Sequence, residues 1–88
     1  MNGLKQIMVA TGMDSKKMAN LLGVTPITVD RWAKGEMNTP TVRALSKHFG
    51  VTYQFLFGDS TESGNKDIDR LLQIVGEMNR IRERNEWL

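Results

Sequence analysis

The chain has 88 residues, with no cysteine, a single histidine and no long apolar run. The absence of cysteine excludes disulfides and thiolate metal sites, and it fits a reducing, cytoplasmic environment. His48 has no cysteine or second histidine to complete a metal site, so we expect a surface residue, no metal and no cofactor. No stretch approaches the roughly 20 apolar residues of a membrane span, and the N-terminus lacks the basic and apolar regions of a signal peptide.

Groups that perform catalysis are also scarce. The sequence contains no cluster of histidine and cysteine and no glycine-rich loop of the kind that cradles phosphate. A chain of this length also has little room for a pocket-sized core. The acidic residues Asp14, Asp30 and Glu36 have simpler roles as a helix cap and as surface groups. We therefore expect no catalytic residues and no enzymatic activity.

The formal net charge of +2 is distributed unevenly along the chain. Residues 1–58 contain seven Lys/Arg against three Asp/Glu, whereas residues 59–88 contain five against seven. A basic front and an acidic rear fit a nucleic-acid-binding domain followed by a tail that does not bind, although many other domains share this imbalance. The length predicts one domain with at most one appended element.

Signals for two short helices lie between Asp14 and Gly35. Asp14 is a favourable N-cap, and the residues after it have the spacing of an apolar helix face. Gly23 follows this face, and glycine can end a helix in the left-handed region with little strain. Thr25 then caps a second helix whose first position is Pro26. This second helix is expected to run to about Lys34. The pattern predicts two helices separated by a tight turn.

This stretch resembles the helix-turn-helix of the Cro/phage-repressor superfamily, also called XRE-like regulators. The matching residues are Asp14, Met18, Ala19, Leu22, Gly23, Val24, Val29, Trp32 and Gly35. The wider resemblance runs from Leu4 to Gly58. It implies an all-α fold, namely a five-helix lambda-repressor-like DNA-binding domain with an appended C-terminal helix. It also implies a sequence-specific regulator of transcription, a repressor of the phage or mobile-element type. A small helical domain without a nucleic-acid partner is the alternative.

Three further helices complete the expected domain, residues 1–58. The first spans Leu4–Thr11, another runs from Thr39-Pro40 to about His48, and a short one is capped by Thr52. Residues 59–66 are small and polar, which predicts a flexible linker or a loop. Residues 67–88 have the apolar spacing of an amphipathic helix.

The C-terminal helix can pack on its own domain or meet the same helix of a second copy. We favour a homodimer, because the family that the chain resembles normally binds DNA as dimers. The expected dimerisation residues are Ile68, Leu71, Leu72, Val75 and Met78. The alternative is an antitoxin-type regulator, or a protein-interaction module, whose C-terminal helix binds a different protein.

The resemblance implies that helix 26–34 enters the major groove of double-stranded DNA. The candidates for reading bases are Pro26, Ile27, Thr28 and Arg31. Arg31 can donate twice to guanine, although a phosphate contact or a salt bridge with Asp30 or Glu36 is the alternative. Ile27 and Pro26 can only make apolar contacts, for example with a thymine methyl group, where relatives often have glutamine. No relative's operator therefore transfers to this chain.

Phosphate contacts would position the domain without specifying a sequence. The N-terminus of helix 15–22 offers free N–H groups to a phosphate, and Ser15 could add a hydroxyl donor. The candidate phosphate contacts are Ser15, Lys16, Lys34, Asn38, Thr39 and Arg43.

Overall fold

The computed structural model describes residues 2–85, with side chains described as far as Met78. Its helices are α1 (Gly3–Thr11), α2 (Ser15–Leu22), α3 (Pro26–Ala33), α4 (Thr39–Phe49), α5 (Tyr53–Phe57) and α6 (Lys66–Asn85). No strand occurs in this part of the chain, which confirms the all-α fold. The last three residues of the expected C-terminal helix lie outside the described residues.

Side-chain caps fix where the first five helices begin. Each has a cap residue in the extended region whose side-chain oxygen accepts a hydrogen bond from the N–H three residues later, at Asn2, Asp14, Thr25, Asn38 and Thr52. The caps at Asp14, Thr25 and Thr52 confirm the sequence signals. The helix expected to start at Thr39-Pro40 is capped one residue earlier, by Asn38.

The helix ends follow the glycine signals. Gly23 ends α2 in the left-handed region, at a φ of 71°, which a residue with a side chain rarely adopts. The backbone N–H of Val24 then donates to the carbonyl of Ala19 at 3.0 Å, which closes the tight turn between α2 and α3. Helix α3 stops at Ala33, with Lys34 as its C-cap, one residue before the predicted end.

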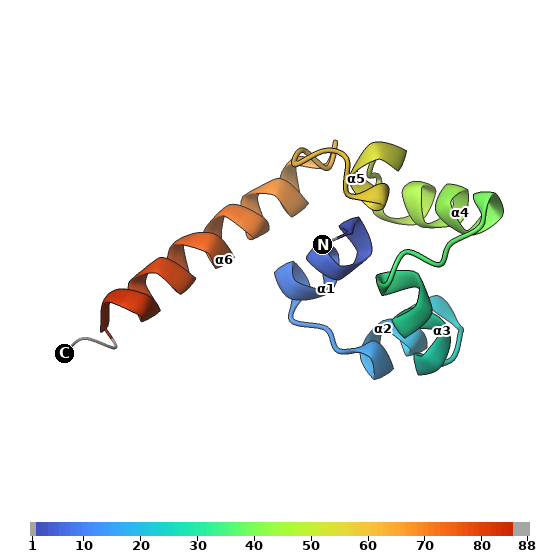
Figure 1. Cartoon of the computed structure of the whole chain (residues 1–88), viewed down its shortest axis with the longest axis horizontal. Coiled ribbons are helices and arrows are strands. Elements are labelled where there is room, and N and C mark those ends of the chain that lie inside the picture. The colour runs from blue at the N-terminus through green and yellow to red at the C-terminus, as the bar shows by residue number, and fades with distance from the viewer. Residues whose placement is uncertain (1, 86–88) are drawn as a thin grey trace.

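The core is built around α1, which contacts α3, α5 and α6. Figure 1 shows this helix in the middle of the molecule, with α5 and α6 on one side and α2 and α3 on the other. Leu4 and Ile7 of α1 are fully buried with Phe55 and Leu56 of α5. Because α1 is covered on several sides, it sets the positions of the other elements.

The polar segment before α6 is a loop held by hydrogen bonds. The side chain of Ser63 is fully buried, and its backbone carbonyl accepts from the N–H of Thr52 at 2.8 Å. The backbone N–H of Ser63 donates to the Asp69 carboxylate at 2.9 Å. The side-chain amide of Asn65 donates to the carbonyl of Phe49 at 2.7 Å, while its oxygen accepts from N–H groups in the first turn of α6. The loop therefore fixes where α6 starts.

Helix α6 returns to pack on α1 before it extends beyond the domain. Ile68 is only 7% exposed within the core, and Leu72 packs against that core. Both residues were expected to contact a second copy, but Ile68 is enclosed by its own domain and Leu72 is half-buried against the same core. The C-terminal end of α6 points away from the other helices (Figure 1).

None of the helices within residues 2–85 combines the length and the apolar character that crossing a membrane requires.

Two glycines offer a matched test of this packing. A Cβ on Gly3 would lie 2.4 Å from the backbone oxygen of Phe55 and 2.7 Å from the Cα of Leu56, so α1 would have to move away from α5. We expect Gly3→Ala to reduce the free energy of unfolding by about 1–3 kcal/mol.

The control is Gly76→Ala in α6, where a Cβ would meet nothing within 4 Å. Alanine is the better helix former, so this variant should gain roughly 0.5–1 kcal/mol. Urea unfolding followed by circular dichroism measures both effects. Equal changes in the two variants would contradict the close approach of α1 to α5.

Candidate nucleic-acid interface

Helix α3 presents one face to the core and the opposite face to solvent. Val29 is completely buried and Trp32 is half-buried. Pro26 and Arg31 are exposed, and Ile27 is 67% exposed, a high value for a large apolar side chain. Val29 is therefore a core residue. The candidate base-reading residues lie on the side of α3 that a duplex can reach.

Thr28 is held more tightly than its neighbours on this face. It is half-buried, and its hydroxyl lies 2.8 Å from the hydroxyl of Thr25, which caps the helix. The Thr25 oxygen also accepts from the backbone N–H of Thr28 at 3.3 Å. A hydroxyl has one donor and two acceptor positions, so the Thr28 hydroxyl keeps two of its three positions for contacts beyond Thr25.

Both ends of α3 are tied to the rest of the domain. At its start, the turn after α2 places Thr25, and α2 packs directly on α3. Met18 and Ala19 of α2 are buried on that side. At its end, the side-chain amide of Asn2 donates to the carbonyl of Trp32 at 2.7 Å, which links α3 to the start of α1. The exposed face of α3 is thus held in one orientation, as a surface that docks in a groove requires.

The structure gives Ser15 a partner that the sequence did not reveal. Its hydroxyl donates to the carboxylate of Asp30, which lies on α3, fifteen residues further along the chain. Ser15 was expected to contact a phosphate, but it is engaged within the protein. Asp30 also lines a shallow depression of about 430 Å³ with Lys5 and Lys34. No local spacing signals this pair, because it depends on how α2 crosses α3.

The other candidate phosphate contacts are exposed and lie near the ends of α2, α3 and α4. Lys16 lies in the first turn of α2 and Lys34 at the end of α3. Thr39 and Arg43 lie in the first and second turns of α4. Asn38 is exposed as well, but its side-chain oxygen caps α4 by accepting from a backbone N–H at 2.9 Å, so only its amide donors remain for DNA.

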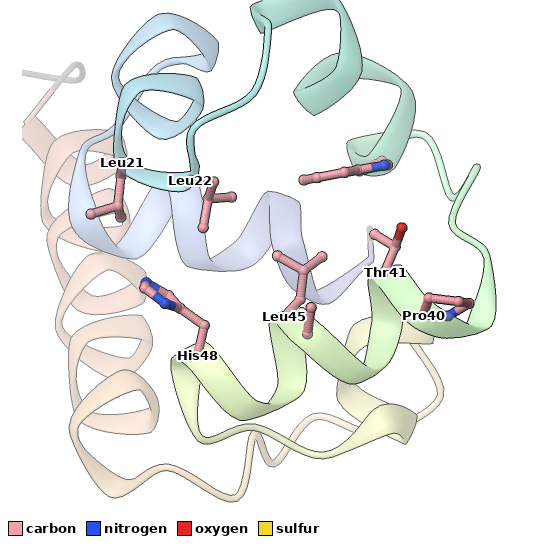
Figure 2. Close-up of a pocket in the computed structure, with 8 residues that line it drawn as sticks. Leu21, Leu22, Pro40, Thr41, Leu45 and His48 are labelled. Atoms are coloured by element: carbon pink, nitrogen blue, oxygen red, sulfur yellow. The ribbon is translucent and has the colours of Figure 1, made fainter.

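An apolar groove of about 420 Å³ lies between α2 and α4. Figure 2 shows Leu21 and Leu22 on one side of it, facing Leu45 and His48 on the other. Leu21 is 48% exposed, so it lines this groove and does not enter the core with Met18. His48 is exposed, as expected from the sequence, and its ring meets the next residue's ring edge-on. Among the side chains that the structure describes, those of residues 2–78, no group of three His, Asp or Glu is placed to hold a metal ion.

Helix α2, the tight turn after it and the outward-facing α3 define a helix-turn-helix protein. A family model described as a Cro/C1-type HTH DNA-binding domain matches residues 3–60, and the chain belongs to this family. The match covers α1 to α5 and ends before α6 begins. No curated protein and no solved structure matches the chain. The family makes the chain a DNA-binding regulator and confirms the resemblance seen in the sequence.

We expect Arg31→Ala to weaken DNA binding by about 1–3 kcal/mol and to relax the preference at one base position. The physical reason is the loss of two hydrogen bonds to guanine at one site only. The measurement is the affinity for a bound sequence and for its single-base variants. Arg70→Ala, which removes an exposed arginine of α6, serves as the control for net charge. An equal loss on every sequence would instead identify Arg31 as a phosphate contact.

Proposed function

We propose that the protein is a sequence-specific transcriptional repressor that binds double-stranded DNA as a homodimer, with α3 in the major groove. The observation that supports this most directly is the division of α3 into a buried side at Val29 and an exposed side at Ile27 and Arg31. Such a helix loses nothing from the core when it enters a groove. We propose that the protein binds DNA without catalysing a reaction and that it acts in the cytoplasm.

The chemistry of the exposed face indicates what kind of base pairs it reads. Arg31 fits guanine, whose O6 and N7 are both acceptors in the major groove. In the isolated domain the Ile27 side chain is 67% exposed to water, which is unfavourable for an apolar group. Contact with a thymine methyl group would remove it from water. Pro26 can make the same type of contact. We therefore expect each half-site to contain at least one G·C and one A·T pair.

The exposed side chains of Lys16, Lys34, Thr39 and Arg43 would hold the domain on the backbone of the duplex. Contacts of this kind release counterions, so the logarithm of the association constant should fall by about 0.9 per phosphate neutralised for each tenfold rise in salt. Together with the base contacts, they would set both the register and the affinity of the complex.

The stripe of α6 that we propose for dimerisation overlaps the expected one at Leu71 and Met78. On the side away from α1, Leu71, Ile74 and Met78 are 39%, 44% and 60% exposed. Their spacing of three and four residues places them along one face of the helix. Ile74 was not among the residues expected to dimerise, although it fits this spacing. Pairing of two such stripes would cover apolar surface that water now contacts.

Two arguments favour a second copy as the partner of this stripe. The family is known for binding DNA through paired motifs, and one helix-turn-helix covers only half of a palindromic site. A different protein bound to α6, as in an antitoxin-type regulator, is the alternative that the same exposed stripe supports. A dimer that occupies a promoter can repress transcription by excluding other proteins from the site.

Selection of bound sequences from random duplexes tests the proposed function. We expect enriched inverted repeats whose half-sites are centred roughly 34–36 Å apart, one turn of the DNA helix. The affinity for the selected sequence should decrease linearly on a logarithmic scale as salt increases. Absence of enrichment, together with binding no stronger than that of a protein of similar charge, would support a protein-interaction module instead.

The variant Ile74→Glu tests the dimer, because it places a charge in the outer stripe without changing the core. The outer stripe of α6 consists of Leu71, Ile74 and Met78. We expect the variant to be monomeric by sedimentation equilibrium. Its affinity for a full inverted repeat should fall by roughly 100-fold or more, because linked half-sites no longer reinforce each other.

The matched control is Gln73→Glu, an exposed neighbour that acquires the same charge. This variant should remain a dimer and bind like the unmodified protein. If both variants stay dimeric, α6 is not the dimer element, and if the unmodified protein is itself a monomer, the homodimer proposal fails.

A further inference from the structure

Two carboxylates of the protein lie at the start of α2. Asp14 caps the helix, since its carboxylate accepts from the backbone N–H of Lys17 at 2.8 Å. Asp30, on α3, accepts from the hydroxyl of Ser15, the first residue of the helix. A helix N-terminus carries a partial positive charge and attracts anions. Here the protein supplies those anions itself.

Asp30 stands out because it lies on the helix that is to enter the groove. It is exposed, and it directly precedes Arg31. Its bond to Ser15 holds the carboxylate at the first turn of α2, the turn that also contains Lys16, a candidate phosphate contact. A duplex that docks against α3 brings its own negative charges to this place.

We propose that Asp30 limits the affinity of the protein for DNA by repelling a backbone phosphate at the start of α2. The inference rests on the proposed function. The repulsion acts through charge alone, so it applies to every DNA sequence. Since non-specific binding comes almost entirely from phosphate contacts, Asp30 keeps the protein from being held on random DNA.

The neighbouring cations reduce this effect without removing it. Lys5 and Lys34 line the same depression as Asp30, and Lys34 follows Asp30 by one helical turn. Lys34 is also a candidate phosphate contact. When Lys34 turns to the DNA, its charge is shared with a phosphate, while the Asp30 carboxylate remains next to Ser15. The charge of Asp30 is therefore better neutralised in the free protein than in the complex with DNA.

The first test is Asp30→Asn, which removes the charge and keeps the shape. Two unit charges about 4 Å apart in water interact strongly enough to change an equilibrium by about fivefold. We expect the association constant to rise by at least that factor at low salt, equally for a selected site and for random duplex. The dependence on salt should steepen by up to about 0.9 in slope, the value for one more phosphate neutralised.

The matched control is Asp59→Asn, the same change at an exposed residue of the loop after α5. Its effect on affinity should stay below twofold. Fluorescence anisotropy with labelled duplexes at several salt concentrations measures both variants, and thermal unfolding verifies that both remain folded.

The second test asks whether Asp30 keeps the Ser15 hydroxyl from the DNA. Ser15→Ala should change affinity little in the unmodified protein, where the hydroxyl already donates to Asp30. In an Asp30→Ala background the hydroxyl is released, and Ser15→Ala should then lower affinity severalfold. The two changes are therefore expected to be non-additive in a double-mutant cycle.

The outcomes separate the two proposals. If neither the unmodified protein nor Asp30→Asn binds duplex DNA, the proposed function is wrong. If both bind with the affinity and salt slope of the Asp59→Asn control, the proposed function stands and the inference about Asp30 is overturned. A loss of affinity confined to sites with cytosine at one position would also overturn it, because Asp30 would then accept from a base.

Discussion

The burial of Val29 is the constraint on which the DNA-facing surface depends. A helix of eight residues has little freedom to rotate once one of its side chains is fully enclosed. With Val29 inside, the helical repeat of 3.6 residues places Ile27 and Arg31 outside. The contacts of α2 and the bond from Asn2 to the end of α3 hold this rotation in place. The surface offered to DNA is thus a consequence of how the core closes.

Charges of opposite sign are adjacent on this surface. Arg31 can donate to a base, while Asp30, the residue before it, donates nothing and carries the same sign as DNA. A helix that presents both a cation and an anion to DNA binds the phosphates less tightly than a helix that presents cations alone. The affinity that remains depends more on base contacts, and those contacts differ between sequences. We propose that the protein combines weak contacts to the DNA phosphates with base contacts from α3, and this combination fits the modest net charge of the chain.

Helix α6 carries an inner and an outer apolar stripe on one backbone. Its inner stripe closes the core at Ile68, and the loop held by Ser63 and Asn65 fixes its start. Its outer stripe remains open to a partner. Because both stripes belong to one rigid helix attached to α1, a partner that holds α6 also holds the orientation of α3. Spacing between two recognition helices would then follow from the geometry of one helix pair.

The sequence alone determined the features that depend on neighbours within about four residues. Caps such as Asp14 and glycine ends such as Gly23 placed the helices, and the spaced motif identified the family, because backbone conformation responds to local side chains. Only the tertiary structure decided which stripe of α6 is buried, and it alone joined Ser15 to Asp30. These outcomes depend on how distant helices cross, and an amphipathic pattern does not specify the surface that a helix meets.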